Sequence, residues 1–348
     1  MIITGSLFFG DDVARDMETA RPPGFETGPN GGVDLVVLDA FGATHFVQYP
    51  VIIPQDFFFP FNPSVPQGRA VDLEVSADSL GVWVLTDFGG IFRAGSTKDP
   101  VEPAELPNLE LPFMLGYDIP FPSDQRDPHM PNPGGATLRA VGFAVIDSDR
   151  DNRAEGYIIL DSQGGYHPLN ADGSAVVPGT YTGSPPNDPH RLLDPSIYAV
   201  PFFPGLDIAR DIELHPSGEG LIVFDGWGGV HPVPADIPDN PVYFATGLDG
   251  TITVGLPYVT SGFDDPSTSV DEGDPTVYGA DAASIFIDLV FCPDGLGFYT
   301  LDRFGGIFAL GSTRSNPDSV VPDFENAPYF FPNPFAVDLE PVRERMKP

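Results

Sequence analysis

One motif recurs five times along the 348-residue chain and limits the folds that the chain can adopt. Each copy has an apolar run, an Asp or Thr, two further residues, Gly-Gly or Gly-Ala, and a second apolar run. Runs of β-branched and aromatic residues that stop at a glycine turn and then restart are typical of antiparallel hairpins. The 39 glycines and 41 prolines that punctuate these runs leave no room for long helices. The hairpins are expected at residues 33–47, 81–94, 156–169, 220–233 and 297–310.

A second motif, close to Ala-Val-Asp-Leu-Glu-Val, precedes each hairpin. Each unit is therefore expected to hold three or four antiparallel strands, which cannot bury a face alone. Radial closure of such units solves this problem, so we expect an all-β propeller with five blades. The alternative is six blades with an incomplete last one, because the sixth copy of the motif has no hairpin after it. The copies are Ala14–Thr19, Ala70–Val75, Ala140–Val145, Ala209–Leu214, Ile287–Cys292 and Ala336–Val342.

The propeller is expected to be a single domain that covers residues 1–348, with Pro-rich loop insertions at 99–133, 178–195 and 234–280. The segment 325–348 is expected either to close the ring or to be exchanged with a neighbouring subunit by strand addition. The expected blades are approximately 1–50, 51–98, 108–173, 197–237 and 241–313.

The repeated hairpins and the strands before them resemble the repeat propellers of the broad WD40 and NHL-like superfamily. They are also similar to uncharacterised prokaryotic repeat proteins with Asp-x-x-Gly-Gly hairpins. The resemblance spans nearly the whole chain and implies a fold, but it implies no particular activity.

The charge of the chain excludes several classes of partner. Fifty acidic and 16 basic side chains give a formal net charge of −34, which repels nucleic-acid backbones and anionic lipid surfaces. The single Cys292 excludes an intrachain disulfide and a cysteine-based metal cluster. No apolar run is long enough to span a membrane, and no export signal is visible at the N-terminus. Neither nucleic-acid binding nor membrane insertion is expected.

An acidic loop interrupts one of the expected hairpins. Asp147, Asp149 and Asp151 occupy positions 1, 3 and 5 of the loop, and Glu155 occupies position 9. Calcium prefers six to eight hard oxygen ligands, and alternate carboxylates in a tight loop bring several of them to one point. The spacing resembles the calcium loops of FG-GAP and integrin-type blades, which implies a further ligand in the backbone carbonyl of Arg153. We expect one Ca²⁺ site here; the alternative is a solvated acidic turn.

The hairpin aspartates are expected to be structural, because groups at the same place in every blade are spread around the ring. An Asp or Thr that begins a turn accepts backbone N–H bonds, and the glycines supply positive φ. The histidines two residues beyond Gly-Gly or Gly-Ala (His45, His167 and His231) are expected to pack, because Phe occupies the position in the other copies. The hairpin set is Asp39, Asp161, Asp225 and Asp302, with Thr86 in the second copy.

The aspartates of the preceding strands are candidates for a carboxylate ring around a central channel. Such a ring, with the glutamates two residues later, could form a cation site or a glycosidase-like acid cluster. The alternative is a structural role in which each Asp bonds to neighbouring backbone or to Arg15 and Arg210. Gly142 and Ala144 break the set in the third copy. The aspartates are Asp16, Asp72, Asp211, Asp288 and Asp338; the glutamates are Glu18, Glu74, Glu213 and Glu340.

No nucleophile elbow, phosphate-binding loop or dinucleotide fingerprint is present. We therefore expect a non-enzymatic, calcium-stabilised propeller at the cell surface or outside the cell. It would act as an interaction module or as a subunit of a surface layer or filament, with a second copy, another surface protein or a glycan as its partner. The alternatives are a propeller glycosidase or carbohydrate-binding protein that uses the channel carboxylates, and an intracellular scaffold. Aromatic stretches occur at 57–61, 198–203, 243–244 and 329–331, and those at 57–61 and 329–331 are candidate sugar platforms or assembly surfaces, or else packing between blades.

Overall fold

A computed structural model gives the fold of the chain. Among the residues that it describes there is no α-helix, and no helix is long and apolar enough to cross a membrane. The described residues are 14–20, 34–46, 69–99, 102, 139–185, 188–197, 202–203, 207–216, 218, 220–226, 228–233, 286–291, 297–302 and 307–311.

The described strands form five three-stranded antiparallel sheets, each made of strands that are consecutive in the chain. The first is β1 (Ala14–Ala20), β2 (Asp34–Asp39) and β3 (Thr44–Phe46), and the second is β4 (Ala70–Val75), β5 (Gly81–Thr86) and β6 (Ile91–Gly95). The third is β7 (Ala140–Ile146), β8 (Gly156–Asp161) and β9 (Tyr166–Asn170), and the fourth is β10 (Ala209–Leu214), β11 (Leu221–Asp225) and β12 (Val230–Val233). The fifth is β13 (Phe286–Phe291), β14 (Gly297–Asp302) and β15 (Ile307–Gly311). A short 3-10 helix, η3 (Pro189–Leu193), lies between the third and fourth sheets in the chain.

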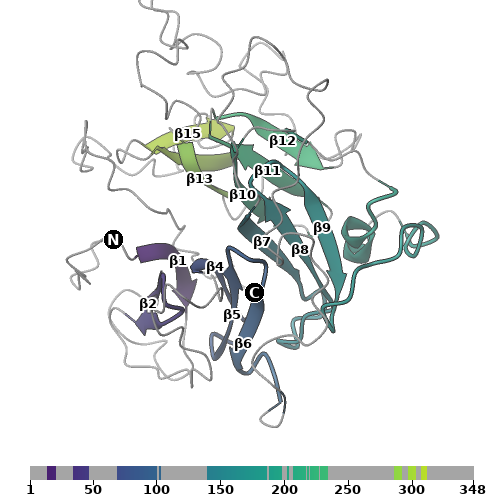
Figure 1. Cartoon of the computed structure of the whole chain (residues 1–348), viewed down its shortest axis with the longest axis horizontal. Coiled ribbons are helices and arrows are strands. Elements are labelled where there is room, and N and C mark those ends of the chain that lie inside the picture. Colours follow the sequence, from purple (N-terminus) through teal and green to yellow (C-terminus); the bar gives the residue numbers. More distant parts are fainter. Residues whose placement is uncertain are drawn as a thin grey trace, which may run out of the picture.

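The first strands of successive sheets contact one another: β1 contacts β4, β4 contacts β7, β7 contacts β10, and β10 contacts β13. Figure 1 shows the sheets following one another around a common centre, with their first strands on the inner side. This all-β, propeller-like arrangement agrees with the fold class expected from the repeats.

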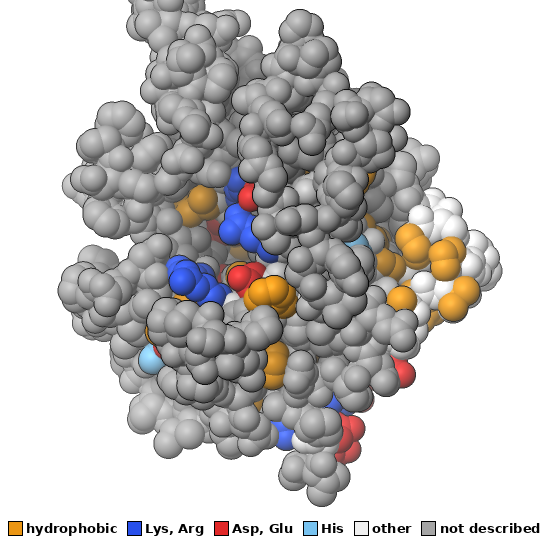
Figure 2. All heavy atoms as spheres, viewed as in Figure 1, with side chains coloured by type: hydrophobic (Ala, Val, Ile, Leu, Met, Phe, Trp, Pro, Cys, Tyr) orange, Lys and Arg blue, Asp and Glu red, His pale blue; other side chains and the backbone are white. Residues whose placement is uncertain are grey.

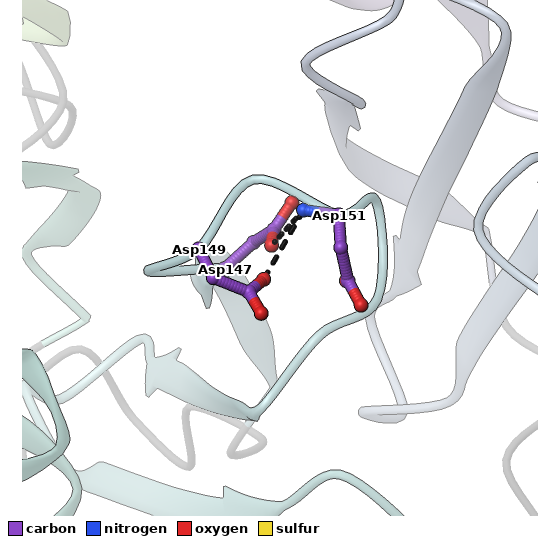
Figure 3. Close-up of side chains that lie close together, drawn as sticks. All are labelled: Asp147, Asp149 and Asp151. Atoms are coloured by element: carbon purple, nitrogen blue, oxygen red, sulfur yellow. Dashed lines mark hydrogen bonds between the residues drawn. The ribbon is translucent and has the colours of Figure 1, made fainter.

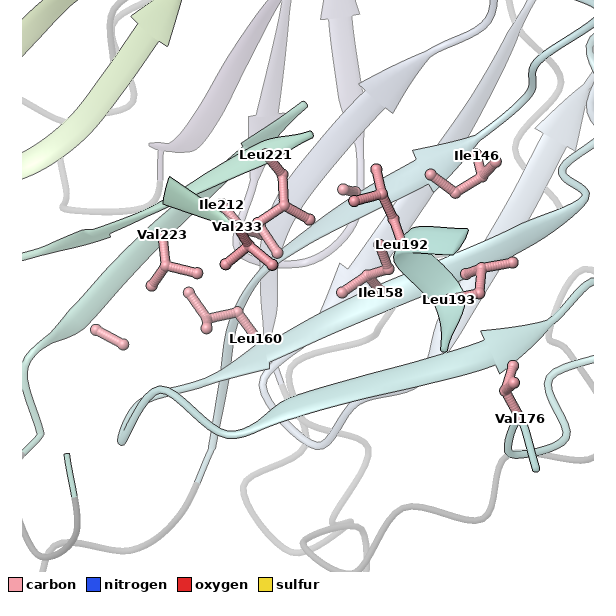
Figure 4. Close-up of a cluster of buried hydrophobic side chains, with 12 residues drawn as sticks. Ile146, Ile158, Leu160, Val176, Leu192, Leu193, Ile212, Leu221, Val223 and Val233 are labelled. Atoms are coloured by element: carbon pink, nitrogen blue, oxygen red, sulfur yellow. The ribbon is translucent and has the colours of Figure 1, made fainter. Parts of the chain in front are cut away.

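The hydrophobic core lies between neighbouring sheets, as expected for units that cannot bury a face alone. Trp83 of the second sheet packs with Phe143 and Tyr157 of the third. Between the third and fourth sheets, Leu160 and Ile212 pack in a cluster that also holds Leu192 and Leu193 of η3 (Figure 4). Both faces of β5 and β8 are covered, so every residue of these middle strands is buried. An aliphatic run without polar alternation is the pattern of such a strand.

Each first strand has a register shift at the same place, after its first residue. The extra residues are Arg15, Val71, Val141, Arg210 and Ile287, and each directly precedes the Asp of the strand motif, or Gly142 in the third sheet. A bulge of this kind increases the local twist and re-aims the side chain beside it. The position of the strand carboxylates thus follows from the bulge.

Several expected features lie outside the described residues. They are Cys292, Asp338, Glu340, the last motif copy at 336–342, the closing segment 325–348, most of the Pro-rich insertions, and the aromatic stretches other than residues 202–203. The exception among the insertions is 178–195, most of which is described and contributes Leu192 and Leu193 to the core.

Candidate functional site

The acidic loop connects β7 to β8, where the sequence places it, and brings three carboxylates together. One carboxylate oxygen from each of Asp147, Asp149 and Asp151 lies within 4.8 Å of the others, so the three could hold a metal ion. Asp149 and Asp151 are exposed, and Asp147 is half-buried. Figure 3 shows the loop folding so that Asp147 and Asp149 approach the backbone of Asp151.

Backbone N–H groups hold these carboxylates. The N–H of Asp151 donates to Asp147 at 3.1 Å and to Asp149 at 3.2 Å, and the N–H of Asn152 donates to the second oxygen of Asp147 at 3.1 Å. Arg150 and Asn152 have positive φ values of 57° and 70°, which turn the chain sharply around the carboxylates. Burial raises the pKa of Asp147 and the charges of Asp151 and Asp149 raise it further, although the two N–H bonds oppose this. A bound cation would relieve the repulsion among the three groups.

Glu155, which the sequence predicts as a ligand through its side chain, is engaged elsewhere. Oε2 of Glu155 accepts hydrogen bonds from the backbone N–H and the hydroxyl of Ser148, and it lies 3.4 Å from Nε2 of His190. The guanidinium of Arg153 pairs with Asp99 at 2.6 Å and with Glu102 at 3.6 Å. The structure therefore brings three of the four expected side-chain ligands together; the fifth expected ligand is the backbone carbonyl of Arg153.

The strand aspartates connect neighbouring first strands. In Asp16, Asp72 and Asp211, one carboxylate oxygen accepts the N–H of the next residue in the same strand, at 2.7–2.8 Å. The other oxygen accepts an N–H from the first strand of the following sheet. Leu73 donates to Asp16, Phe143 donates to Asp72, and Leu289 donates to Asp211.

These aspartates and the glutamates two residues beyond them form one group, which we call the axial cluster: Asp16, Glu18, Asp72, Glu74, Asp211, Glu213 and Asp288. Burial raises the pKa of Asp72 well above its usual value, and the charges of Asp16, Glu74 and Asp211 raise it further. The pKa of Asp211 is raised well above its usual value by burial and by Asp288. Asp72 and Asp211 thus hold protons to higher pH than isolated carboxyl groups would.

The side chain of Glu213 differs from those of Asp16, Asp72 and Asp211, because within the described part it accepts no hydrogen bond from a backbone N–H group. Burial raises its pKa well above the usual value, and the charges of Asp211, Glu74, Glu18 and Asp288 add to the effect. Glu213 is thus repelled by one carboxyl group of its own strand and by three of other strands. Carboxyl groups with strongly perturbed pKa values occur often in functional sites.

Gly142 of β7 occupies the position that Asp holds in the other four first strands. A Cβ added at Gly142 would lie 3.4 Å from Oδ2 of Asp72 and 3.4 Å from Cγ2 of Ile212. The third sheet therefore contributes no carboxyl group to the axial cluster, and Asp72 and Asp211 influence each other across the gap.

The hairpin aspartates bind the turns that they begin. Asp161 accepts the N–H groups of Gln163 and Gly165, both at 2.8 Å, and its other oxygen lies 2.8 Å from Nε2 of His167. Asp39 makes the same contacts with its turn and with His45, and Asp225 bonds to Gly229 and His231. The side chain of Asp302 lies outside the described part.

The histidine contacts were missed by sequence reasoning, which predicted packing alone. The signal was present: in each copy with His, an Asp stands six residues earlier. The second copy has Thr86 and Phe92 at the two positions, so the ionisable residues are replaced together there.

No protein-family model matches the chain, and no curated protein matches it. Among solved structures, the chain is similar to a candidate 6-phosphogluconolactonase from Bacteroides uniformis. The identity is 13%, the match covers 92% of this chain and 81% of the other, and the TM-score is 0.33. A likeness of this size indicates neither the fold nor the activity of the chain.

Proposed function

We propose that the chain is a non-enzymatic calcium-binding module with a propeller fold. The observation that carries the proposal is the approach of three carboxylate oxygens to within 4.8 Å in the loop between β7 and β8. Carboxylates on alternate residues suit Ca²⁺, which takes oxygen ligands in flexible geometry, better than Mg²⁺, which demands a near-ideal octahedron. Glu155 and the carbonyl of Arg153 would complete the ligand set after Glu155 turns from Ser148 towards the ion.

The exposure of the loop favours weak binding. Asp149 and Asp151 are exposed, so their charges are largely hydrated before an ion arrives. Calcium sites in extracellular modules have Kd values of about 10⁻⁴–10⁻³ M, and we expect a value in this range. A site of this strength is filled only in calcium-rich surroundings, which is consistent with a role outside the cell.

Calorimetric titration of the whole chain with CaCl₂ tests the proposal. One ion is expected to bind to the wild-type chain, and Asp149→Asn is expected to weaken binding at least tenfold. The matched control is Asp172→Asn, which changes an exposed turn aspartate of the same sheet and should leave binding unchanged. Equal binding by the wild type and Asp149→Asn would refute the site, and so would tighter binding of MgCl₂ than of CaCl₂.

We also propose that the sheets are the blades of a five-bladed ring, with six blades as the alternative, and that the module binds a second copy or another surface molecule. The order of contacts from β1 through β13 supports successive blades. Light scattering of the full chain in millimolar calcium tests the assembly: polymers would support a layer or filament subunit, and a 37.3 kDa monomer would exclude one.

A carbohydrate-directed role is the second candidate, and Glu213 is the observation that favours it. Burial and four neighbouring carboxyl groups raise the pKa of Glu213, and a carboxylic acid with a raised pKa is one member of the carboxyl pair that glycoside hydrolysis uses. A screen of chromogenic glycosides with the wild type and Glu213→Gln tests this role. Hydrolysis that Glu213→Gln abolishes would support it, and hydrolysis that survives the substitution would exclude Glu213 as the acid.

A further inference from the structure

Four successive sheets each place one arginine beside the alanine that begins their first strand. Arg69 and Arg139 directly precede β4 and β7, and Arg15 and Arg210 are the second residues of β1 and β10. The part of the chain that the structure describes contains eight arginines, so half of them lie next to the first residue of a first strand. We call Arg15, Arg69, Arg139 and Arg210 the arginine edge.

The arginine edge lies at the end of the sheets that carries the hairpin turns. The carbonyl of Arg69 accepts the N–H of Asp87 in the β5–β6 turn, and the carbonyl of Arg139 accepts the N–H of Ser162 in the β8–β9 turn, both at 2.8 Å. The N–H of Ala140 in turn donates to the carbonyl of Asp87 at 2.8 Å. These bonds fix the starts of β4 and β7 against rigid turns.

Two carboxylates, those of Asp207 and Asp87, lie near three of the arginine side chains. Nitrogens of Arg139 and Arg210 lie 3.4 Å and 3.1 Å from the two oxygens of Asp207. Burial raises the pKa of Asp87, and the nearby charges of Arg139 and Arg69 oppose that increase. Burial lowers the pKa of Arg210, and the nearby charge of Arg139 lowers it further, while Asp207 opposes both effects. Arg139 and Arg210 therefore share Asp207, while Arg139 and Arg69 influence Asp87 by their charge.

Two of the guanidinium groups are open to a ligand. Arg69 is exposed, and within the described part its side chain has no hydrogen bond or ion pair. The Arg139 side chain is 52% exposed, and its contact with Asp207 is long. Figure 2 shows basic side chains beside acidic ones near the middle of the face in view. Such a concentration of arginine is unexpected in a chain of net charge −34.

We propose that the arginine edge binds the oxyanion group, carboxylate or phosphate, of a small hydroxylated molecule such as a sugar acid or a sugar phosphate. The guanidinium fork matches both oxyanions with two parallel hydrogen bonds. Arg15 and Arg210 directly precede Asp16 and Asp211 in the chain, so the arginine edge adjoins the axial cluster. Hydroxyl groups of the ligand would donate to those carboxylates. This site is independent of the calcium loop.

Calorimetric titration of the full chain at about 20 mM NaCl, with glucuronate, glucose 1-phosphate and neutral glucose, tests the proposal. At least one anionic sugar is expected to bind and glucose is not, and binding should weaken as the salt concentration increases. Stronger binding of glucuronate would identify a carboxylate ligand, and stronger binding of glucose 1-phosphate a phosphate ligand.

Arg69→Gln and Arg139→Gln are each expected to weaken binding at least tenfold. Arg69→Lys keeps the charge and loses the fork, so it should weaken binding less than Arg69→Gln does. The matched control is Arg191→Gln, which changes an arginine of η3 and should bind like the wild type. Binding of glucose as tight as that of the anions, no binding of either anion, or unchanged binding by Arg69→Gln would overturn the proposal. Arg69 is exposed, so its variants are expected to fold even if Arg139→Gln does not.

Discussion

Replacing Asp161 with alanine should destabilise the third sheet by removing three contacts of one buried carboxylate. Asp161 is 2% exposed and accepts the N–H groups of Gln163 and Gly165 while it contacts His167. Leaving a buried donor without an acceptor costs about 1–3 kcal/mol. The N–H of Gln163 is buried and that of Gly165 is partly buried. The expected loss is therefore about 2–5 kcal/mol of the free energy of unfolding.

The second sheet indicates how much of this loss a hydroxyl can recover. Thr86 stands at the position of Asp161, and its Oγ1 accepts the N–H of Gly90 at 2.9 Å. Asp161→Thr should therefore keep one of the two turn bonds and lose the contact with His167. We expect a loss of about 1–3 kcal/mol, between the wild type and Asp161→Ala.

Urea unfolding followed by circular dichroism measures these differences, provided that the slope of the transition is unchanged. The control is Asp172→Ala in the exposed turn after β9, where water can replace the bonds to Ser174. Its expected cost is below about 1 kcal/mol. The reasoning would be wrong if Asp172→Ala cost as much as Asp161→Ala, or if Asp161→Thr were the least stable of the three.

Three further predictions concern pH and backbone conformation. The raised pKa values of Asp72, Asp211 and Glu213 mean that the native state holds protons that the unfolded chain releases near pH 4, so stability should fall as the pH rises above about 4. Glu213→Gln should flatten that dependence in urea midpoints. Although burial raises the pKa of Asp194, hydrogen bonds from Gly179, Ser196 and Tyr181 lower it to about 2. Its contribution to stability should therefore be lost as the pH falls from about 4 towards 2, and Asp194→Asn should remove that loss and make residues 178–195 more sensitive to proteolysis. Gly95→Ala should cost more than about 2 kcal/mol, because φ is 71° and the new Cβ would lie 2.0 Å from the Leu80 carbonyl oxygen; Gly183→Ala, with no atom within 4 Å, is its thermal-melting control.

The repeated hairpins could be predicted from the sequence because the interactions that form them are local. Asp161 and the N–H groups that it accepts lie within four residues, so the Asp-x-x-Gly-Gly pattern contains the whole turn. The acidic loop is local in the same sense: β7 ends one residue beyond the predicted motif copy Ala140–Val145, and β8 begins at residue 156, where the predicted hairpin begins. Composition and pattern also indicate the core, because β5 and β8 are continuous apolar runs.

The contacts between sheets could not be predicted in this way, because they join residues that are far apart in the chain. The bond from Leu73 to Asp16 spans 57 residues, and the bond from Leu289 to Asp211 spans 78. The motif identifies a repeated Asp in each strand, but it does not identify which backbone N–H the carboxylate accepts. The bulge before each Asp, which decides the direction of the side chain, has no mark in the sequence beyond the motif itself.

The departures from the repeat are more informative about function than the repeat is, and the third sheet has two of them. It carries the acidic loop between β7 and β8, where the second and fourth sheets have short turns, and it replaces the strand Asp with Gly142. The repeated aspartates accept backbone N–H groups within and between sheets, so they account for the fold. A ligand needs unlike groups, and the third sheet holds both departures and an arginine: the loop at the end of β7, and Gly142 and Arg139 at its start. If the third sheet is the functional side of the molecule, Asp161→Thr in this sheet should abolish the binding of both calcium and the oxyanion. The same substitution at the matching position of the first sheet, Asp39→Thr, should retain both.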